Sequence, residues 1–209
     1  MAPLLIVLEG MDGSGKSYQA NRLQQYAQRA GLTAATGHFP VYNSPTGVII
    51  SAFLKGLLPL SPEDAQIWYA NNRRENLPQL QQLLRENDIV ILDRYYPSGW
   101  AYGMAQGLHI SWLESLDTEV PRPDAIFILD LPAEATRARR KSRDIFEADM
   151  SFLNTVRANY LTLAQRYGWA VVNARATKEE VTAQLLSVMR TVWEVGATEY
   201  PGVIGKAVC

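Results

Sequence analysis

A glycine-rich run near the start of the chain combines the residue types that bind phosphate. Residues 10–17 read GMDGSGKS. Glycines let backbone N–H groups turn toward phosphate oxygens, Lys16 can reach the β and γ phosphates, and Ser17 can offer its hydroxyl to Mg²⁺. The preceding residue, Glu9, could orient Lys16 or a water molecule, a minor role. The spacing predicts a nucleotide site made by Gly10, Asp12, Gly13, Ser14, Gly15, Lys16 and Ser17.

The elements around this run are those that a phosphate loop requires. A short apolar run precedes it, and a helical pattern begins at Lys16 and stops at Gly31. Comparable apolar runs, separated by helical periodicity, occupy residues 4–8, 33–39, 89–92, 125–129 and 170–172. This alternation predicts an α/β protein with a central five-stranded parallel sheet flanked by helices.

A second candidate site follows the third apolar run. Asp93 and Arg94 stand just past its carboxyl end, where open α/β sheets bind ligands. A carboxylate at this point can help to hold Mg²⁺, and an adjacent arginine can clamp a second phosphate with its planar fork. The alternative is a surface ion pair between the two. An arginine placed for another anion favours a phosphorylated acceptor.

Composition narrows the class of protein. The chain has 209 residues with 20 Lys and Arg against 21 Asp and Glu, so a general nucleic-acid or membrane-surface binder is not expected. The single cysteine, Cys209, excludes an intrachain disulfide and fits a cytoplasmic protein. We expect one domain over residues 1–195, followed by a loosely ordered tail over 196–209 that lacks periodicity.

Several segments together resemble the thymidylate kinase family of P-loop nucleoside monophosphate kinases. The similarity runs in order from about residue 4 to about residue 192. The segments that carry it are the phosphate loop, Phe39-Pro40, Asn72-Arg73-Arg74-Glu75, Asp93-Arg94-Tyr95, Ser98 to Tyr102 and Asp144-Ile145-Phe146-Glu147. The resemblance implies a P-loop kinase fold with a short basic lid at about 137–149. It also implies Mg²⁺ as cofactor, ATP and dTMP as substrates, and a homodimer.

The resemblance also implies roles for single residues. Asp12 would accept a hydrogen bond from the 3′-hydroxyl of the acceptor sugar, and Arg94 would bind the acceptor phosphate. Tyr69 would stack on thymine, Arg73 would hydrogen-bond the base, and Tyr102 would crowd the 2′ position. The remaining substrate residues would be Phe39, Ser98 and Glu147, and Arg175 would lie near adenine. For Tyr69 and Phe39 the plain alternative is packing in the core.

The basic lid would carry the remaining catalytic charge. Arg137, Arg139, Arg140, Lys141 and Arg143 crowd into one segment of a slightly acidic protein. Such a run is usually a solvated helix face. Family members carry their catalytic arginine either in the phosphate loop or in the lid, and this phosphate loop has none. The chain therefore resembles the lid type, with Arg139 and Arg143 favoured.

The expected reaction moves the γ-phosphoryl group of ATP onto dTMP, giving dTDP and ADP. The alternative within enzymes is another nucleoside monophosphate kinase of relaxed base specificity. Tyr42, near the place where many relatives have an arginine for the acceptor phosphate, supports this alternative. A GTP-binding switch would need an N-K-x-D segment, which the sequence lacks. A non-catalytic nucleotide-binding module is the third possibility.

Overall fold

A parallel sheet forms the centre of the molecule. The computed structural model describes residues 3–138, 145–146 and 149–199. Its five strands lie in the order β2-β3-β1-β4-β5, and every neighbouring pair is parallel. The strands are β1 (Leu4–Glu9), β2 (Ala34–His38), β3 (Ile89–Asp93), β4 (Ala125–Asp130) and β5 (Ala170–Asn173). The expected five-stranded parallel sheet is confirmed.

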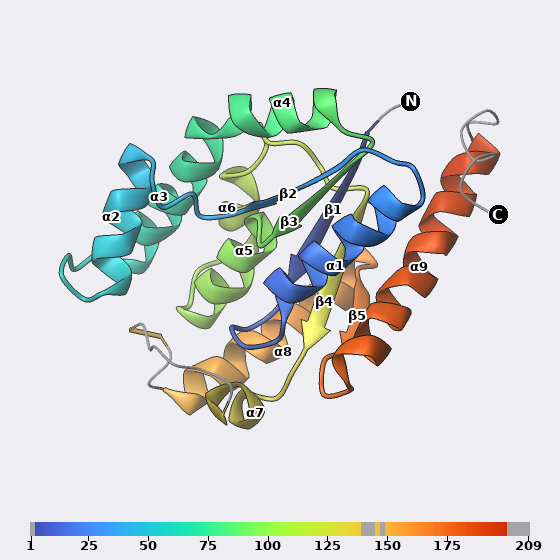
Figure 1. Ribbon diagram of the computed structural model, residues 1–209. Coiled ribbons are helices and arrows are strands. Elements are labelled where there is room, and N and C mark those ends of the chain that lie inside the picture. Colours follow the sequence, from blue (N-terminus) through green and yellow to red (C-terminus); the bar gives the residue numbers. More distant parts are fainter. Residues whose placement is uncertain (1–2, 139–144, 147–148, 200–209) are drawn as a thin grey trace.

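Helices cover both faces of the sheet (Figure 1). Between β1 and β3 lie α1 (Lys16–Arg29), α2 (Pro45–Leu54), α3 (Pro62–Glu75) and α4 (Leu77–Glu86). After β3 come α5 (Tyr96–Ala105), α6 (Ile110–Ser115), α7 (Ala133–Ala138), α8 (Met150–Tyr167) and α9 (Lys178–Glu199). None of the helices in the described part of the chain is both long and apolar enough to cross a membrane.

The side chains of β1 show how the two faces become two cores. Successive residues of a strand point to opposite faces. Ile6 and Leu8 pack in the cluster that contains residues of α1 and α9, whereas Leu5 and Val7 pack in the cluster that contains residues of α4, α5 and α8. Because β1 is buried on both sides, its sequence is a continuous apolar run instead of an alternating one.

The order of the strands brings the two candidate sites together. β1 and β3 are neighbours, with Leu8 opposite Asp93. Both strands end at the same edge, so the phosphate loop after β1 and the Asp93-Arg94 pair after β3 open onto one crevice. Open α/β sheets place their ligands in such a crevice.

The end of the chain differs from its expected boundary. We expected a loosely ordered tail from Gly196, but α9 continues through this point to Glu199. A single glycine inside a helix costs only about 1 kcal/mol relative to alanine. Residues 200–209 lie outside the described part of the chain.

Candidate active site

The phosphate loop has the backbone shape that its glycines predict. Gly10, Gly13 and Gly15 all have positive φ angles, of 131°, 79° and 96°. A Cβ atom on Gly10 would lie 2.6 Å from the carbonyl oxygen of Leu129, so no other residue fits there without a shift. The loop leads directly into α1 at Lys16, so the amino end of that helix points at any bound phosphate.

Lys16 lies back over the loop. Its Nζ donates a hydrogen bond of 3.0 Å to the carbonyl oxygen of Met11 and lies 3.5 Å from Oδ1 of Asp12. Burial, followed by the charge of Arg94, lowers the pKa of Lys16 to about 7, and Asp93 and Glu9 oppose this shift. A bound phosphate would supply the negative charge that this buried ammonium lacks.

Ser17 and Asp93 offer oxygen ligands at the same crevice. The hydroxyl of Ser17 donates a hydrogen bond to Oδ2 of Asp93, which joins the start of α1 to the end of β3. The other carboxylate oxygen of Asp93 is buried and has no hydrogen-bond partner in the described part of the chain. Hydroxyl and carboxylate oxygens are ligands that Mg²⁺ prefers, so this pair fits that ion.

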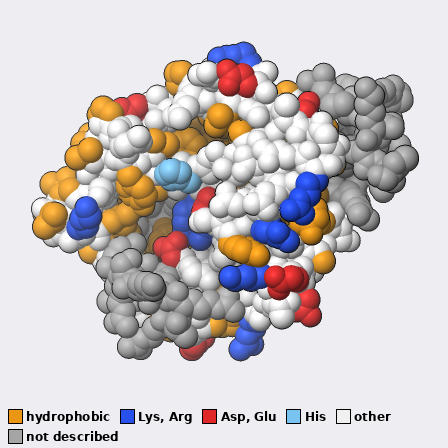
Figure 2. Space-filling view, in the orientation of Figure 1, with side chains coloured by type: hydrophobic (Ala, Val, Ile, Leu, Met, Phe, Trp, Pro, Cys, Tyr) orange, Lys and Arg blue, Asp and Glu red, His pale blue; other side chains and the backbone are white. Residues whose placement is uncertain are grey.

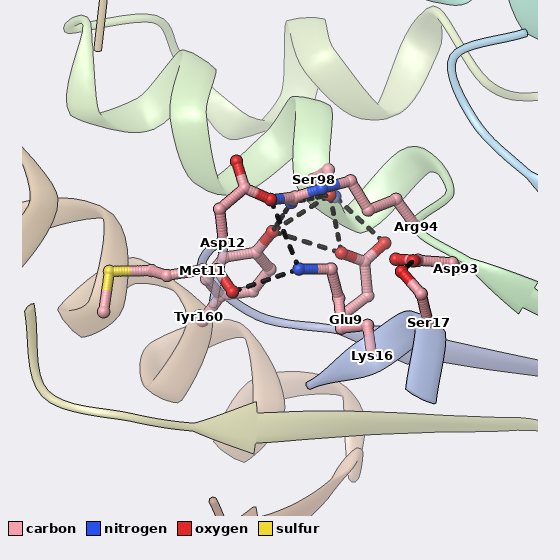
Figure 3. Close-up of polar contacts among 9 residues, drawn as sticks. All are labelled: Glu9, Met11, Asp12, Lys16, Ser17, Asp93, Arg94, Ser98 and Tyr160. Atoms are coloured by element: carbon pink, nitrogen blue, oxygen red, sulfur yellow. Dashed lines mark hydrogen bonds and ion pairs between the residues drawn. The ribbon is translucent and has the colours of Figure 1, made fainter. Parts of the chain in front are cut away.

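Arg94 turns toward the phosphate loop from an unusual backbone conformation. Its φ angle of 68° lies in the left-handed region, which non-glycine residues rarely adopt. Its side chain donates hydrogen bonds of 2.5 Å to Oδ1 of Asp12, 2.9 Å to Oγ of Ser98 and 3.3 Å to the hydroxyl of Tyr160. The guanidinium therefore lies between the loop and the helices that follow it (Figure 3).

Glu9 is the centre of this polar cluster. Its side chain is fully buried and accepts hydrogen bonds from the backbone N–H of Tyr95 at 2.7 Å, from the hydroxyl of Ser98 at 2.6 Å and from that of Tyr160 at 3.1 Å. Burial raises the pKa of the Glu9 carboxyl, and the Arg94 guanidinium and the hydrogen bonds from Ser98 and Tyr95 oppose the rise. These donors satisfy the buried carboxylate and hold it in one position.

A cleft opens beside Arg94. Figure 2 shows the hollowed face, with basic and acidic side chains at the floor of the hollow and hydrophobic side chains along one side. The residues expected at an acceptor site that line the cleft are Asp12, Phe39, Tyr69, Arg73, Arg94, Ser98 and Tyr102. Phe39 is also largely buried, whereas Tyr69 is only half-buried and is therefore not a core residue.

The far end of the cleft carries a buried ion pair. Nε of Arg73 donates a hydrogen bond of 2.7 Å to Asp117, and the indole N–H of Trp100 donates one of 3.1 Å to the other oxygen of that carboxylate. Gln66 also lines the cleft and is only 2% exposed. Gly99 lies between the two, because a Cβ there would be 3.0 Å from Oε1 of Gln66 and 3.6 Å from Nη2 of Arg73.

Comparison with known proteins decides the family. A model of the thymidylate kinase family matches residues 8–185. The chain belongs to the thymidylate kinase family. A probable thymidylate kinase of Thermococcus kodakarensis is 32% identical over an alignment of 202 residues that covers 90% of this chain and 98% of that protein. A thymidylate kinase of Danio rerio is 33% identical over 181 residues, 85% of each chain.

A solved structure agrees with the sequence relatives. The structure of thymidylate kinase from Candida albicans superposes with a TM-score of 0.80 at 30% identity and covers 91% of this chain and 92% of its own. The P-loop kinase fold and the family resemblance expected from the sequence are thus confirmed. The chain is a nucleoside monophosphate kinase, and its reaction is the phosphorylation of dTMP by ATP.

Not every expected thymidylate kinase residue reaches the crevice. Arg175 is exposed after β5, where its backbone N–H bonds to Oδ1 of Asn173, and it lines neither the cleft nor the hollow beside the phosphate loop. Arg139, Arg143 and Glu147 lie outside the described residues, so their roles stay predictions. They belong to the segment between α7, which ends at Ala138, and α8.

Four residues of the site had little or no signal in the sequence. Glu9 received a minor role, Tyr160 fits the helical pattern of α8 equally well as a core residue, and Asp117 and Gln66 stand in no motif. What marks such residues is a charged or amide side chain that is buried beside a strand end or on a helix face. This mark can be recognised only once burial is known from the structure.

Proposed function

We propose that Arg94 and Asp12 bind the acceptor dTMP in the cleft while the phosphate loop binds ATP on the other side of Arg94. The observation that supports this most directly is the 2.5 Å contact between Arg94 and Asp12, beside a cleft that both residues line. In the bound state the acceptor phosphate replaces Asp12 as a partner of the guanidinium, and the carboxylate of Asp12 accepts the 3′-hydroxyl.

The cleft walls are assigned to the base and sugar. Tyr69 stacks on the pyrimidine ring, Arg73 donates to a base oxygen, and Phe39, Ser98 and Tyr102 enclose the sugar and phosphate. The buried bond to Asp117 supports the role of Arg73, because it fixes a long side chain in one orientation. Arginine has only donors, so the pocket suits a base that presents an acceptor at this edge, as thymine does.

On the donor side, the backbone of Gly10, Gly13, Ser14 and Gly15 surrounds the phosphates and Lys16 reaches the β and γ oxygens. Ser17 and Asp93 would hold Mg²⁺. When bound, the ion neutralises charge on the β and γ phosphates. Arg175 is proposed near adenine, although it lines neither hollow.

The chemistry requires little besides position and charge. An oxygen of the dTMP phosphate attacks the γ phosphorus of ATP in line, the new oxygen–phosphorus bond forms, and the bond to the β-phosphate oxygen breaks. The nucleophile is already an anion, so no general base is needed. Lys16 and Arg94, together with Arg139 and Arg143 of the lid segment and Glu147 beside the acceptor, complete the proposed set.

A homodimer and a cytoplasmic location complete the proposal. The resemblance to the family supports both, and the single cysteine is consistent with a reducing compartment. Sedimentation of the purified protein at micromolar concentration tests the dimer.

Replacement of Arg94 by methionine tests the acceptor assignment. The change removes the charge at nearly constant length, and we expect the KM for dTMP to rise about a hundredfold in a coupled ADP-release assay, because a buried phosphate contact is lost. The KM for ATP should stay within about threefold. Arg122→Met is the matched control, since Arg122 is exposed and lies over the ring of Tyr96. An unchanged KM for dTMP in Arg94→Met would contradict the assignment.

A further inference from the structure

We propose that Glu9 is a positioning residue for the phosphoryl acceptor: through the hydroxyls of Ser98 and Tyr160, and through the backbone of Tyr95, it directs Arg94 at the cleft. The inference rests on the proposed role of Arg94 as the ligand of the acceptor phosphate. It assigns a function to a carboxylate that itself lines neither the cleft nor the hollow beside the phosphate loop, where Gly13, Lys16 and Ser17 lie.

The partners of Glu9 all belong to groups that hold Arg94. Oε1 accepts from the backbone N–H of Tyr95 at 2.7 Å and from that of Ser98 at 3.3 Å. Oε2 accepts from the hydroxyl of Ser98 at 2.6 Å and from that of Tyr160 at 3.1 Å. The same two hydroxyl oxygens accept from Nη1 of Arg94 at 2.9 and 3.3 Å. Glu9 thus accepts a hydrogen bond from each of the two hydroxyl groups that the guanidinium contacts (Figure 3).

The direction of the protons shows why a carboxylate is needed. A hydroxyl has one proton to donate, and an ionised carboxylate only accepts. When Ser98 and Tyr160 both donate to Glu9, their oxygen lone pairs remain free for Arg94, whose guanidinium only donates. An amide in the place of Oε2 would donate to these hydroxyls and turn their protons toward the guanidinium. The carboxylate therefore sets the polarity of the whole chain of bonds.

Glu9 also holds the backbone turn from which Arg94 projects. The left-handed conformation of Arg94 is unfavourable for a residue with a Cβ and persists only where the surroundings fix it. Two backbone bonds do so: Arg94 N–H donates to the carbonyl oxygen of Leu8 at 2.9 Å, and Tyr95 N–H donates to the side chain of Glu9. The carboxylate of Glu9 therefore supports the backbone next to Arg94 through Tyr95 and the guanidinium of Arg94 through the hydroxyls of Ser98 and Tyr160.

Glu9→Gln tests the proposal because glutamine keeps the volume and one carbonyl oxygen. We expect the KM for dTMP to rise at least tenfold, while the KM for ATP stays within about twofold. Ser98→Ala and Tyr160→Phe remove single acceptors of Arg94 and should each raise the KM for dTMP about three- to tenfold. Because the three act through one chain, Glu9→Gln combined with Ser98→Ala should be less harmful than the product of the two single effects.

Asp130→Asn is the matched control. Asp130 ends the neighbouring strand β4 and forms a two-point ion pair with Arg157 of α8 at 2.6 and 2.7 Å, without any contact with Arg94. The Asp130→Asn variant should have a lower thermal midpoint of unfolding, with an unchanged ratio of the KM for dTMP to the KM for ATP. If Glu9→Gln leaves the KM for dTMP within twofold, or raises both KM values together with a lower midpoint, Glu9 is only structural and the proposal fails.

The two proposals can fail separately. If Arg94→Met raises the KM for dTMP but the Glu9, Ser98 and Tyr160 variants do not, Arg94 binds the acceptor without the positioning chain. If Arg94→Met itself has no effect, the acceptor assignment is wrong. Should Glu9→Gln not fold, Tyr160→Phe and its combination with Ser98→Ala decide the matter, since each removes only a hydroxyl group.

Discussion

The phosphate loop and the acceptor cleft are built in different ways. The loop consists of consecutive residues 10–17, and its binding groups are backbone amides whose directions follow from glycines at fixed positions. Apart from Asp12 of the loop, the cleft draws its polar side chains from α3, from the turn after β3 and from α5, and fixes them by contacts with residues that lie elsewhere in the chain. Local sequence therefore specifies the first region, whereas tertiary packing specifies the second.

Lys16→Met should separate the two regions most strongly. It removes the side chain that reaches the donor phosphates, and we expect kcat/KM to fall about a thousandfold, the upper range for loss of one electrostatic contact to the transition state. Binding of dTMP alone, measured by calorimetry, should change less than fivefold. A comparable loss of dTMP binding would show that the two regions are not independent.

Asp117→Asn should weaken the cleft without affecting the loop. Asparagine cannot accept from both Arg73 and Trp100 as the carboxylate does, and breaking one side of a buried ion pair costs about 3 kcal/mol of stability. We expect a lower urea midpoint and an increase of the KM for dTMP, with the KM for ATP unchanged. Retention of both wild-type stability and wild-type KM would show that Asp117 does not hold Arg73.

The stability of the ligand-free protein should rise with pH between about 7 and 9. Burial, followed by the charge of Arg94, lowers the folded-state pKa of Lys16 to about 7, so in this range the unfolded chain binds more protons than the folded one. The free energy of unfolding then increases by at most about 1.4 kcal/mol per pH unit. Urea titrations at several pH values, compared with Lys16→Met, measure this slope. An equal slope in the variant would assign it to other groups.

Gln66 lines the cleft next to Arg73, on the other side of Gly99, so we expect its amide to hydrogen-bond the base as well. Gln66→Leu should have the smallest effect and should act on the base alone. The loss of one neutral hydrogen bond corresponds to about a fivefold change. We expect the preference for dTMP over dCMP to fall by that factor, with kcat for dTMP nearly constant. Gln82→Leu, on the exposed face of α4, is the control. A preference equal to that of the wild type would remove Gln66 from the base site.

The sequence predicted the fold and the loop because their signals are local. The five strands and the start of α1 at Lys16 follow from short patterns. Arg94 followed from its place just past the third apolar run, whereas Asp12 and the other cleft residues came from the family resemblance. The supporting residues did not, because the bonds of Asp117 with Arg73 and of Glu9 with Tyr95 and Tyr160 join positions 44, 86 and 151 residues apart. No pattern within a sequence window contains both partners.

The contacts of Asp12 give the empty protein a counterion of its own. This carboxylate lies between Lys16 and Arg94, at 3.5 and 2.5 Å, so the two cations share one negative charge before any ligand arrives. Every incoming anion must displace an internal competitor. Orthophosphate or sulfate brings nothing to offset that loss, whereas a nucleotide adds contacts from its sugar and base. We therefore expect orthophosphate and sulfate to compete only weakly with nucleotides for this site.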